Sequence, residues 1–157
     1  MNIANDEEFL STVKGFIHPV NNFLELNSLC SNLVVIIQDY LKDVSWCGFY
    51  FLNNKELFLG PFVGPIACEK IKVGNGVCGT SIKENKTIIV NDVKAFSGHI
   101  ACDSNSRSEL VVPFYNKNKK QLGVIDLDST LISRFTKEDA IIIEKIENYF
   151  SINIKDF

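Results

Sequence analysis

Hydrophobic residues recur at helical spacing near the N-terminus and at strand spacing further along the chain. Residues 6–17 and 27–42 carry apolar positions three and four apart, as an amphipathic helix does, and the second stretch shows this pattern more clearly. Residues 46–52 and 56–62 are instead rich in aromatic and branched side chains, and the polar run at 53–55 separates them. These two stretches therefore predict a β-hairpin with a short turn.

Three further apolar stretches, residues 87–90, 109–115 and 121–128, predict additional strands, and a polar turn at 116–120 joins the last two. Residues 63–108 lack a clear period outside the short strand and hold three of the five cysteines. A long irregular segment inside a compact domain is typical of a binding or catalytic region. We therefore look for chemistry there.

The C-terminal stretch predicts a final helix that begins after Thr136. Threonine is a favourable N-cap residue, and Asp139 stands three residues further on, ahead of a helical apolar pattern. Helices, two hairpins and a last helix favour the α+β class, with an antiparallel sheet and helices packed on it. The sequence contains no repeat and no Pro/Ser-rich linker, so we expect residues 1–157 to form a single domain.

Charge and composition argue against several classes of protein. The net charge of −3 and the pI near 5.4 disfavour a nucleic-acid partner, which would require a clustered basic face. The first residues are acidic where a secretory signal would be basic, and no apolar run reaches the roughly 18–20 residues of a membrane span. We therefore expect a cytoplasmic protein, whose five cysteines are buried thiols or reactive groups and not a disulfide framework.

Cys102 stands out among these cysteines because it lies in the polar, loop-like stretch 96–108. Cys30 and Cys47 lie in apolar stretches, as buried thiols usually do. Exposed backbone amides and the nearby Arg107 would favour a thiolate at Cys102. Cys102 is thus a candidate reactive thiol, although an inert loop cysteine fits the sequence equally well.

The segment Gly74–Gly79 matches the spacing of a dinucleotide-binding fingerprint, and Asp92 lies near the position of its acidic partner. The apolar strand before the glycines and the full crossover helix after them are missing, which argues against that function. The glycines more simply make a tight turn into a short helix with Cys78 in its first turn. There the helix dipole would lower the pKa of the thiol.

A zinc site is another interpretation of the cysteine-bearing segment. His99, Cys102, Cys68 and Cys78 supply suitable ligand types. However, the spacing between the cysteines is irregular and no Cys-x-x-Cys pair is present, which disfavours a structural zinc site.

Three acidic residues are predicted to share one face of the sheet. Strand alternation places Asp126 and Asp128 on the same face, and pairing around a turn near residue 118 places Glu109 opposite one of them. Packed together, such acids raise one another's pKa, so at least one would stay protonated near neutral pH and donate a proton to a substrate oxygen. The alternative is a merely solvated face.

Trp46 and Tyr50 lie four residues apart on a predicted strand, so their side chains point to the same face. Two aromatic residues in this arrangement belong to the core or form a wall for a small apolar group.

Taken together, these residues resemble free methionine-(R)-sulfoxide reductase, an enzyme family built on the GAF fold. The resemblance runs from about Trp46 to Asp139. It is carried by the segments Trp46–Tyr50, Leu59–Phe62, Ala67–Ile71, Gly76–Gly79, Gly98–Asp103, Ser108–Pro113 and Gly123–Ser129. Ligand-sensing GAF domains share the fold but lack three cysteines in these settings. Residues 63–66 depart from the usual polar link, so we expect the loop that carries Cys68 to move differently.

The resemblance implies that the protein reduces free L-methionine-(R)-sulfoxide with electrons from thioredoxin, supplied by NADPH through thioredoxin reductase, and holds no cofactor or metal of its own. It implies that Cys102 is the nucleophile, that Cys68 resolves the intermediate, and that Cys78 joins the disulfide relay. It also implies a homodimer. A GAF-type sensor of a small ligand or of redox state is the alternative function.

The resemblance also assigns the substrate-binding residues. The acids Glu109, Asp126 and Asp128 would hold the sulfoxide oxygen and the amino group, and the aromatics Trp46 and Tyr50 would line the pocket for the methyl group.

Overall fold

The computed structural model describes residues 5–98 and 104–157. Its helices are α1 Asp6–Phe16, α2 Phe23–Tyr40, α3 Gly76–Glu84 and α4 Lys137–Ser151, with the short 3₁₀ helix η1 Val93–Ala95. Its strands are β1 Trp46–Asn53, β2 Glu56–Val63, β3 Lys70–Lys72, β4 Ile88–Val90, β5 Ser108–Tyr115 and β6 Gln121–Ser129. The helices and strands predicted from the sequence are confirmed within a few residues at each end.

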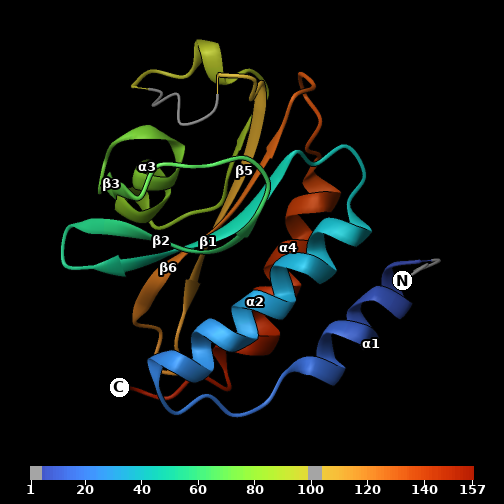
Figure 1. The fold of residues 1–157 in the computed structure, drawn as a ribbon, viewed down its shortest axis with the longest axis vertical. Helices are drawn as coiled ribbons and strands as arrows, with labels where there is room; N and C mark the ends of the chain where they lie inside the picture. The colour runs from blue at the N-terminus through green and yellow to red at the C-terminus, as the bar shows by residue number, and fades with distance from the viewer. Residues whose placement is uncertain (1–4, 99–103) are drawn as a thin grey trace.

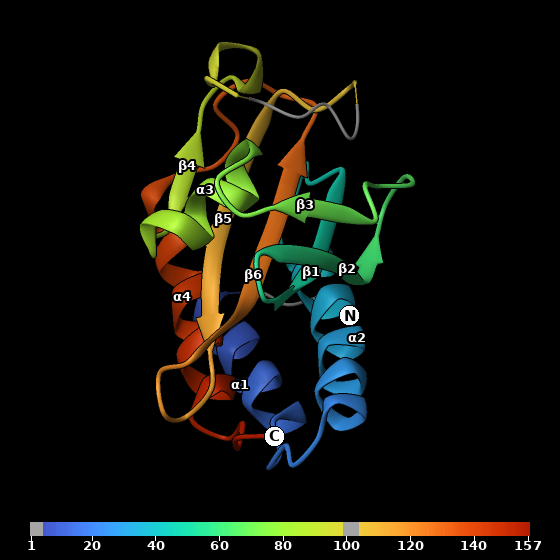
Figure 2. The same ribbon diagram turned by 90° about the vertical axis from the view of Figure 1, so that its left-hand side faces the viewer.

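The strands form one six-stranded sheet in the order β3-β2-β1-β6-β5-β4, and all neighbours are antiparallel (Figures 1 and 2). The expected α+β class is therefore confirmed. Strand β3 was not anticipated, because it has three residues, of which Ile71 alone is buried, and this is too short to give a periodic signal.

Local chemistry explains where the longer helices begin. Asn22 accepts a hydrogen bond from the backbone N–H of Glu25 and caps α2, so this helix starts earlier than the predicted residue 27. Thr136 and Asp139 form a complete capping box at the start of α4, as the sequence predicted. In the hairpin between β1 and β2, Asn54 adopts a positive φ of 55°, a conformation that asparagine tolerates well.

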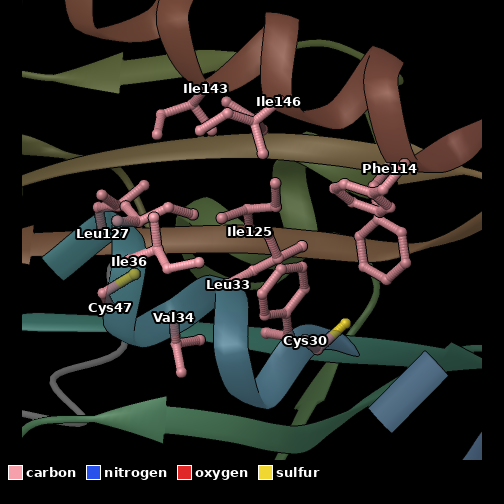
Figure 3. Close-up of a cluster of buried hydrophobic side chains, with 14 of the residues drawn as sticks. Cys30, Leu33, Val34, Ile36, Cys47, Phe114, Ile125, Leu127, Ile143 and Ile146 are labelled. Atoms are coloured by element: carbon pink, nitrogen blue, oxygen red, sulfur yellow. The ribbon is translucent and has the colours of Figure 1, made fainter. Parts of the chain in front are cut away.

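Helices α2 and α4 cover one face of the sheet, and α1 packs against both of them (Figure 1). Figure 3 shows the core on this face, where Leu33 and Ile36 of α2 meet Ile125 of β6 below Ile143 of α4. Three phenylalanines extend it, since the ring of Phe114 contacts those of its neighbours Phe49 and Phe150.

Two of the cysteines belong to this core. Cys30 and Cys47 are fully buried, as expected, and burial raises the pKa of both thiols.

None of the helices within the described ranges is long and apolar enough to cross a membrane.

Helix α3 lies on the opposite face of the sheet, over β5 and β6 (Figure 2). A second, smaller cluster fills the space beneath it. Its apolar members include Val77 and Ile82 of α3 and Val111 and Val124 of the sheet. The sequence-predicted acids and aromatic residues lie on this face.

Candidate active site

The register of β5 and β6 places the three predicted acids side by side. Glu109 pairs with Asp128. Asp126 lies two residues before Asp128 on β6, on the same face, and pairs with Val111. Glu109 is 7% exposed and Asp126 is 5% exposed. The predicted shared face is confirmed, and because two of its three acids are buried, the interpretation as a merely solvated face is wrong for them.

The acids line a cavity of about 40 Å³ between the sheet and α3. At roughly 10–15 Å³ for each molecule, this is room for about three waters. Five of the sequence-predicted residues border the cavity together with Cys78. These five are Trp46, Tyr50, Glu109, Asp126 and Asp128. The exposed side chain of Ile66 also lines it, so the cavity reaches the surface.

Trp46 forms an aromatic wall with two neighbouring rings. The Trp46 ring stacks on Tyr50, with centroids 5.9 Å apart, and on Phe62, with centroids 5.5 Å apart. Gly48 lies beneath the indole, where a β carbon would stand only 2.3 Å from Trp46 Cη2. The missing side chain of Gly48 thus lets the indole lie flat on strand β1.

The same two aromatic residues hold the loop that leads to Cys68. Trp46 Nε1–H donates a hydrogen bond to the carbonyl oxygen of Pro65 at 3.1 Å, and the hydroxyl of Tyr50 donates to the carbonyl oxygen of Cys68 at 3.0 Å. Strand β1 therefore fixes both the aromatic wall and the backbone at Cys68. Cys68 is disulfide-bonded, whereas Cys30, Cys47 and Cys78 are free thiols.

Cys78 lies in the first turn of α3, as the glycine turn predicted. Its side chain is 3% exposed, and its S–H donates to Glu109 Oε1 at 3.9 Å. Burial raises the pKa of the Cys78 thiol, and the neighbouring carboxyls of Asp126 and Glu109 raise it further. The prediction that the helix dipole lowers this pKa is wrong, because desolvation and two adjacent acids outweigh the dipole.

The acids perturb one another in the same direction. Burial raises the pKa of Glu109 well above its usual range, and the charges of Asp126 and Asp128 add to this effect. Burial and the charge of Asp128 likewise raise the pKa of Asp126. Burial and the neighbouring charges therefore favour the protonated forms of Glu109 and Asp126, as expected for packed acids.

Ser106 was not identified from the sequence as a site residue. It lines the cavity, and its hydroxyl donates a hydrogen bond to Asp128 Oδ1 at 2.5 Å. In the sequence it is one of several small polar residues in a loop, and no periodic pattern distinguishes it.

Arg107, which was expected to favour a thiolate at Cys102, forms an ion pair with Asp92, at 3.2 Å between Nη2 and Oδ2.

Two predicted residues, His99 and Cys102, lie outside the described residues. Within the part of the chain that is described, the group with potential metal-ligand atoms close together consists of Cys78, Glu109 and Asp126.

The GAF domain family model matches residues 24–155 of the chain. The free methionine-R-sulfoxide reductase of Saccharomyces cerevisiae is 45% identical over 130 residues, which cover 81% of this chain and 72% of the yeast protein. The chain belongs to the free methionine-R-sulfoxide reductase family of GAF domains. The Escherichia coli free methionine-R-sulfoxide reductase is 49% identical over 109 residues, covering 69% of this chain and 66% of that protein.

Solved structures give the same answer for the fold. The reduced form of the free methionine-R-sulfoxide reductase (fRMsr) of Staphylococcus aureus superposes on this chain with a TM-score of 0.88 at 38% identity. The match covers 97% of this chain and 96% of that one. The same enzyme in complex with its substrate gives a TM-score of 0.86 at 37% identity, covering 98% and 97% of the two chains. These matches confirm both the GAF fold and the resemblance to free methionine-R-sulfoxide reductases drawn from the cysteine and acid segments.

Proposed function

We propose that this chain reduces free L-methionine-(R)-sulfoxide to L-methionine. One observation carries the proposal: two buried acids, whose pKa values burial raises, face the same small cavity as an aromatic wall. Family membership supplies the substrate, because relatives named for this reaction share between 45% and 49% of their aligned residues with the chain.

Glu109 and Asp126 act as the proton source. A sulfoxide sulfur is a poor electrophile until its oxygen is protonated, so an acid that stays protonated at neutral pH has to meet that oxygen. The raised pKa of each carboxyl meets this requirement. Asp128, held by Ser106, receives the positively charged amino group of the substrate.

Trp46 and Tyr50 receive the methyl group and the sulfur. Thioether sulfur and its methyl group interact favourably with aromatic rings. The stacked indole and phenol present such a surface at the cavity, and the hydrogen bonds from both rings to loop carbonyls keep them in place.

Cys102 is the nucleophile in this proposal. Its thiolate attacks the sulfur of the protonated sulfoxide, the oxygen passes to the thiol as a sulfenic acid, and L-methionine leaves. The thiol of Cys68 then condenses with the sulfenic acid, which forms a disulfide and releases water. That Cys68 is disulfide-bonded supports its role as the resolving residue. Cys78 exchanges into this disulfide as a relay.

Reduction of the final disulfide completes the cycle. The dithiol of thioredoxin takes over the disulfide and restores two thiols on this chain, and NADPH reduces thioredoxin through thioredoxin reductase. We further propose that the chain acts in the cytoplasm as a homodimer, as a single domain over residues 1–157 and without a bound cofactor.

The test is a thioredoxin-coupled assay that follows NADPH consumption with free methionine-(R)-sulfoxide. We expect turnover with the (R)-epimer and none with the (S)-epimer. Equal rates with both epimers, or none above the background, would contradict the proposal. Tight binding of a ligand without turnover would instead support the GAF-sensor alternative.

Cysteine variants test the assigned roles. Cys102→Ser should abolish turnover, and Cys68→Ser should give a single burst that leaves a trapped sulfenic acid. Cys30→Ala is the matched control, because Cys30 is buried in the core on the other face of the sheet, and this variant should turn over normally. If Cys102→Ser retained the wild-type rate, the nucleophile would be misassigned.

Glu109→Gln tests the acid. An amide cannot release a proton as a carboxylic acid does, so reduction at neutral pH should slow by roughly 100-fold, the usual scale of general acid catalysis. An unchanged rate would show that Glu109 is not the proton donor.

A further inference from the structure

Cys78, Glu109 and Asp126 together offer a set of metal-ligand atoms that the proposed reaction does not require as a set. One atom from each, the Cys78 sulfur and one oxygen from each carboxyl, all lie within 4.8 Å of one another, and all three side chains are buried. They come from α3, β5 and β6, so elements distant in the sequence bring them together.

A second observation also points to a cation at this cluster. Asp126 Oδ1 is buried and has no hydrogen-bond partner among the residues that the structure describes. Asp126 itself is 5% exposed and lines the cavity. A buried carboxyl oxygen without a partner is costly, and a bound cation would compensate for it.

We propose that Cys78, Glu109 and Asp126 bind a Zn²⁺ ion, with the fourth position open to the cavity. Zinc accepts thiolate and carboxylate ligands together, at about 2.3 Å from sulfur and about 2.0 Å from oxygen. In a tetrahedron these lengths separate a sulfur from an oxygen ligand by roughly 3.5 Å. The observed distance from Cys78 Sγ to Glu109 Oε1 is 3.9 Å, so a small adjustment is sufficient.

The ligand types select zinc over the hard cations. Ca²⁺ takes six to eight oxygen ligands and Mg²⁺ requires an octahedron of oxygens, whereas this cluster offers one sulfur and two carboxyl groups. This set also differs from the His99, Cys102, Cys68 and Cys78 set considered from the sequence, with which it shares Cys78 alone.

Bound zinc would compete with the substrate. The ion would occupy both carboxyls that the sulfoxide oxygen needs, and its open position would lie where the substrate enters. This consequence rests on the proposed function, whereas zinc binding itself does not. Zinc would therefore be a reversible inhibitor that acts through the substrate site.

Metal titration of the oxidised protein tests the site, because Cys68 is then disulfide-bonded while Cys78 remains a free thiol. Calorimetry with Zn²⁺ alone should show one ion bound per chain. Titration with Co²⁺ should give a thiolate-to-cobalt charge-transfer band. Cys78→Ser should remove the band and weaken Zn²⁺ binding by at least roughly tenfold, and Asp126→Asn should weaken it similarly.

Cys30→Ala is the control and should bind both metals as the wild type does. Unchanged zinc affinity in Cys78→Ser, or bound Co²⁺ without the thiolate band, would overturn the site.

Competition between zinc and the substrate is measured by titrating the same protein with free methionine-(R)-sulfoxide and following the fluorescence of Trp46, the single tryptophan. Zinc should suppress the sulfoxide-dependent change, and an unaltered sulfoxide titration with zinc bound would overturn the inhibition.

Metal binding and reductase activity can fail separately in these experiments. A chain that binds zinc through Cys78 but never turns over the sulfoxide would contradict the proposed function and leave the zinc site standing. A chain that turns over the sulfoxide normally but fails to bind zinc would contradict the zinc site and leave the proposed function standing.

Discussion

Replacing Gly48 with alanine tests the aromatic wall directly. A β carbon at Gly48 would lie 2.3 Å from Trp46 Cη2 and 2.7 Å from Phe62 Cβ. Carbon atoms in contact stand about 3.5–4.0 Å apart, so the indole of Trp46 has to move by about 1.2 Å or more. The β carbon of Phe62 belongs to strand β2 and cannot yield in the same way, so most of the displacement falls on the indole.

The displacement should affect both stability and catalysis. Forcing an extra methyl group into a packed site costs about 1–3 kcal/mol, which urea unfolding would detect as a lower free energy of unfolding. A misplacement of about 1 Å can slow an enzyme about 100-fold, so kcat/KM for the sulfoxide should fall by roughly 10–100-fold. Because Trp46 is the single tryptophan, its fluorescence emission reports the movement without interference.

Gly15→Ala is the matched control. A β carbon at Gly15 meets no atom within 4 Å, and this glycine lies inside helix α1. Alanine is favoured over glycine in a helix, and Gly15 is the second-last residue of α1, so the control should be at least as stable as the wild type and fully active. If Gly48→Ala kept the emission, stability and KM of the wild type, the argument that Gly48 makes room for the indole would be refuted.

Four further predictions follow from the described contacts. Burial raises the pKa of Glu109 and Asp126 above the values of the unfolded chain, so the free energy of unfolding of the wild type should fall as the pH rises. In Asp126→Asn this fall should be smaller, as measured by urea unfolding between about pH 4 and pH 9. Thr136→Ala removes the capping box of α4 and should lower the free energy of unfolding by about 1 kcal/mol, measured by thermal melting. Ser106→Ala removes one hydrogen bond to the Asp128 carboxylate and should raise KM more than it lowers kcat in steady-state kinetics. Cys78 should react with a thiol reagent far more slowly in the native protein than in urea, because burial raises its pKa.

The sequence could predict the sheet because strand alternation and turn length together fix a register. Asp126 and Asp128 had to share a face, and the short turn after β5 had to bring Glu109 opposite one of them, which the pairing of Glu109 with Asp128 confirms. Strand β3 could not be predicted in the same way. Its three residues are held by pairing with β2, a contact between segments that no local pattern encodes.

The chemistry of Cys78 shows the same limit at the level of one residue. The glycine turn correctly placed this cysteine in the first turn of a helix, and the local dipole suggested a lowered pKa. The dominant effects come instead from burial and from acids on two strands far along the chain, which reverse the direction. Ser106 was missed for a related reason, since its importance comes from one hydrogen bond to Asp128.

The two faces of the sheet divide stability and function between them. The face under α2 and α4 buries a large apolar core, in which Phe49, Phe114 and Phe150 meet. The face under α3 buries Glu109 and Asp126, whose raised pKa values mean that folding disfavours their charged forms. A site built for protonation of a substrate has to accept this cost, because solvating the acids would return their pKa to its ordinary range. Substitutions that make the α3 face more apolar should therefore stabilise the protein and, in the same step, reduce its activity.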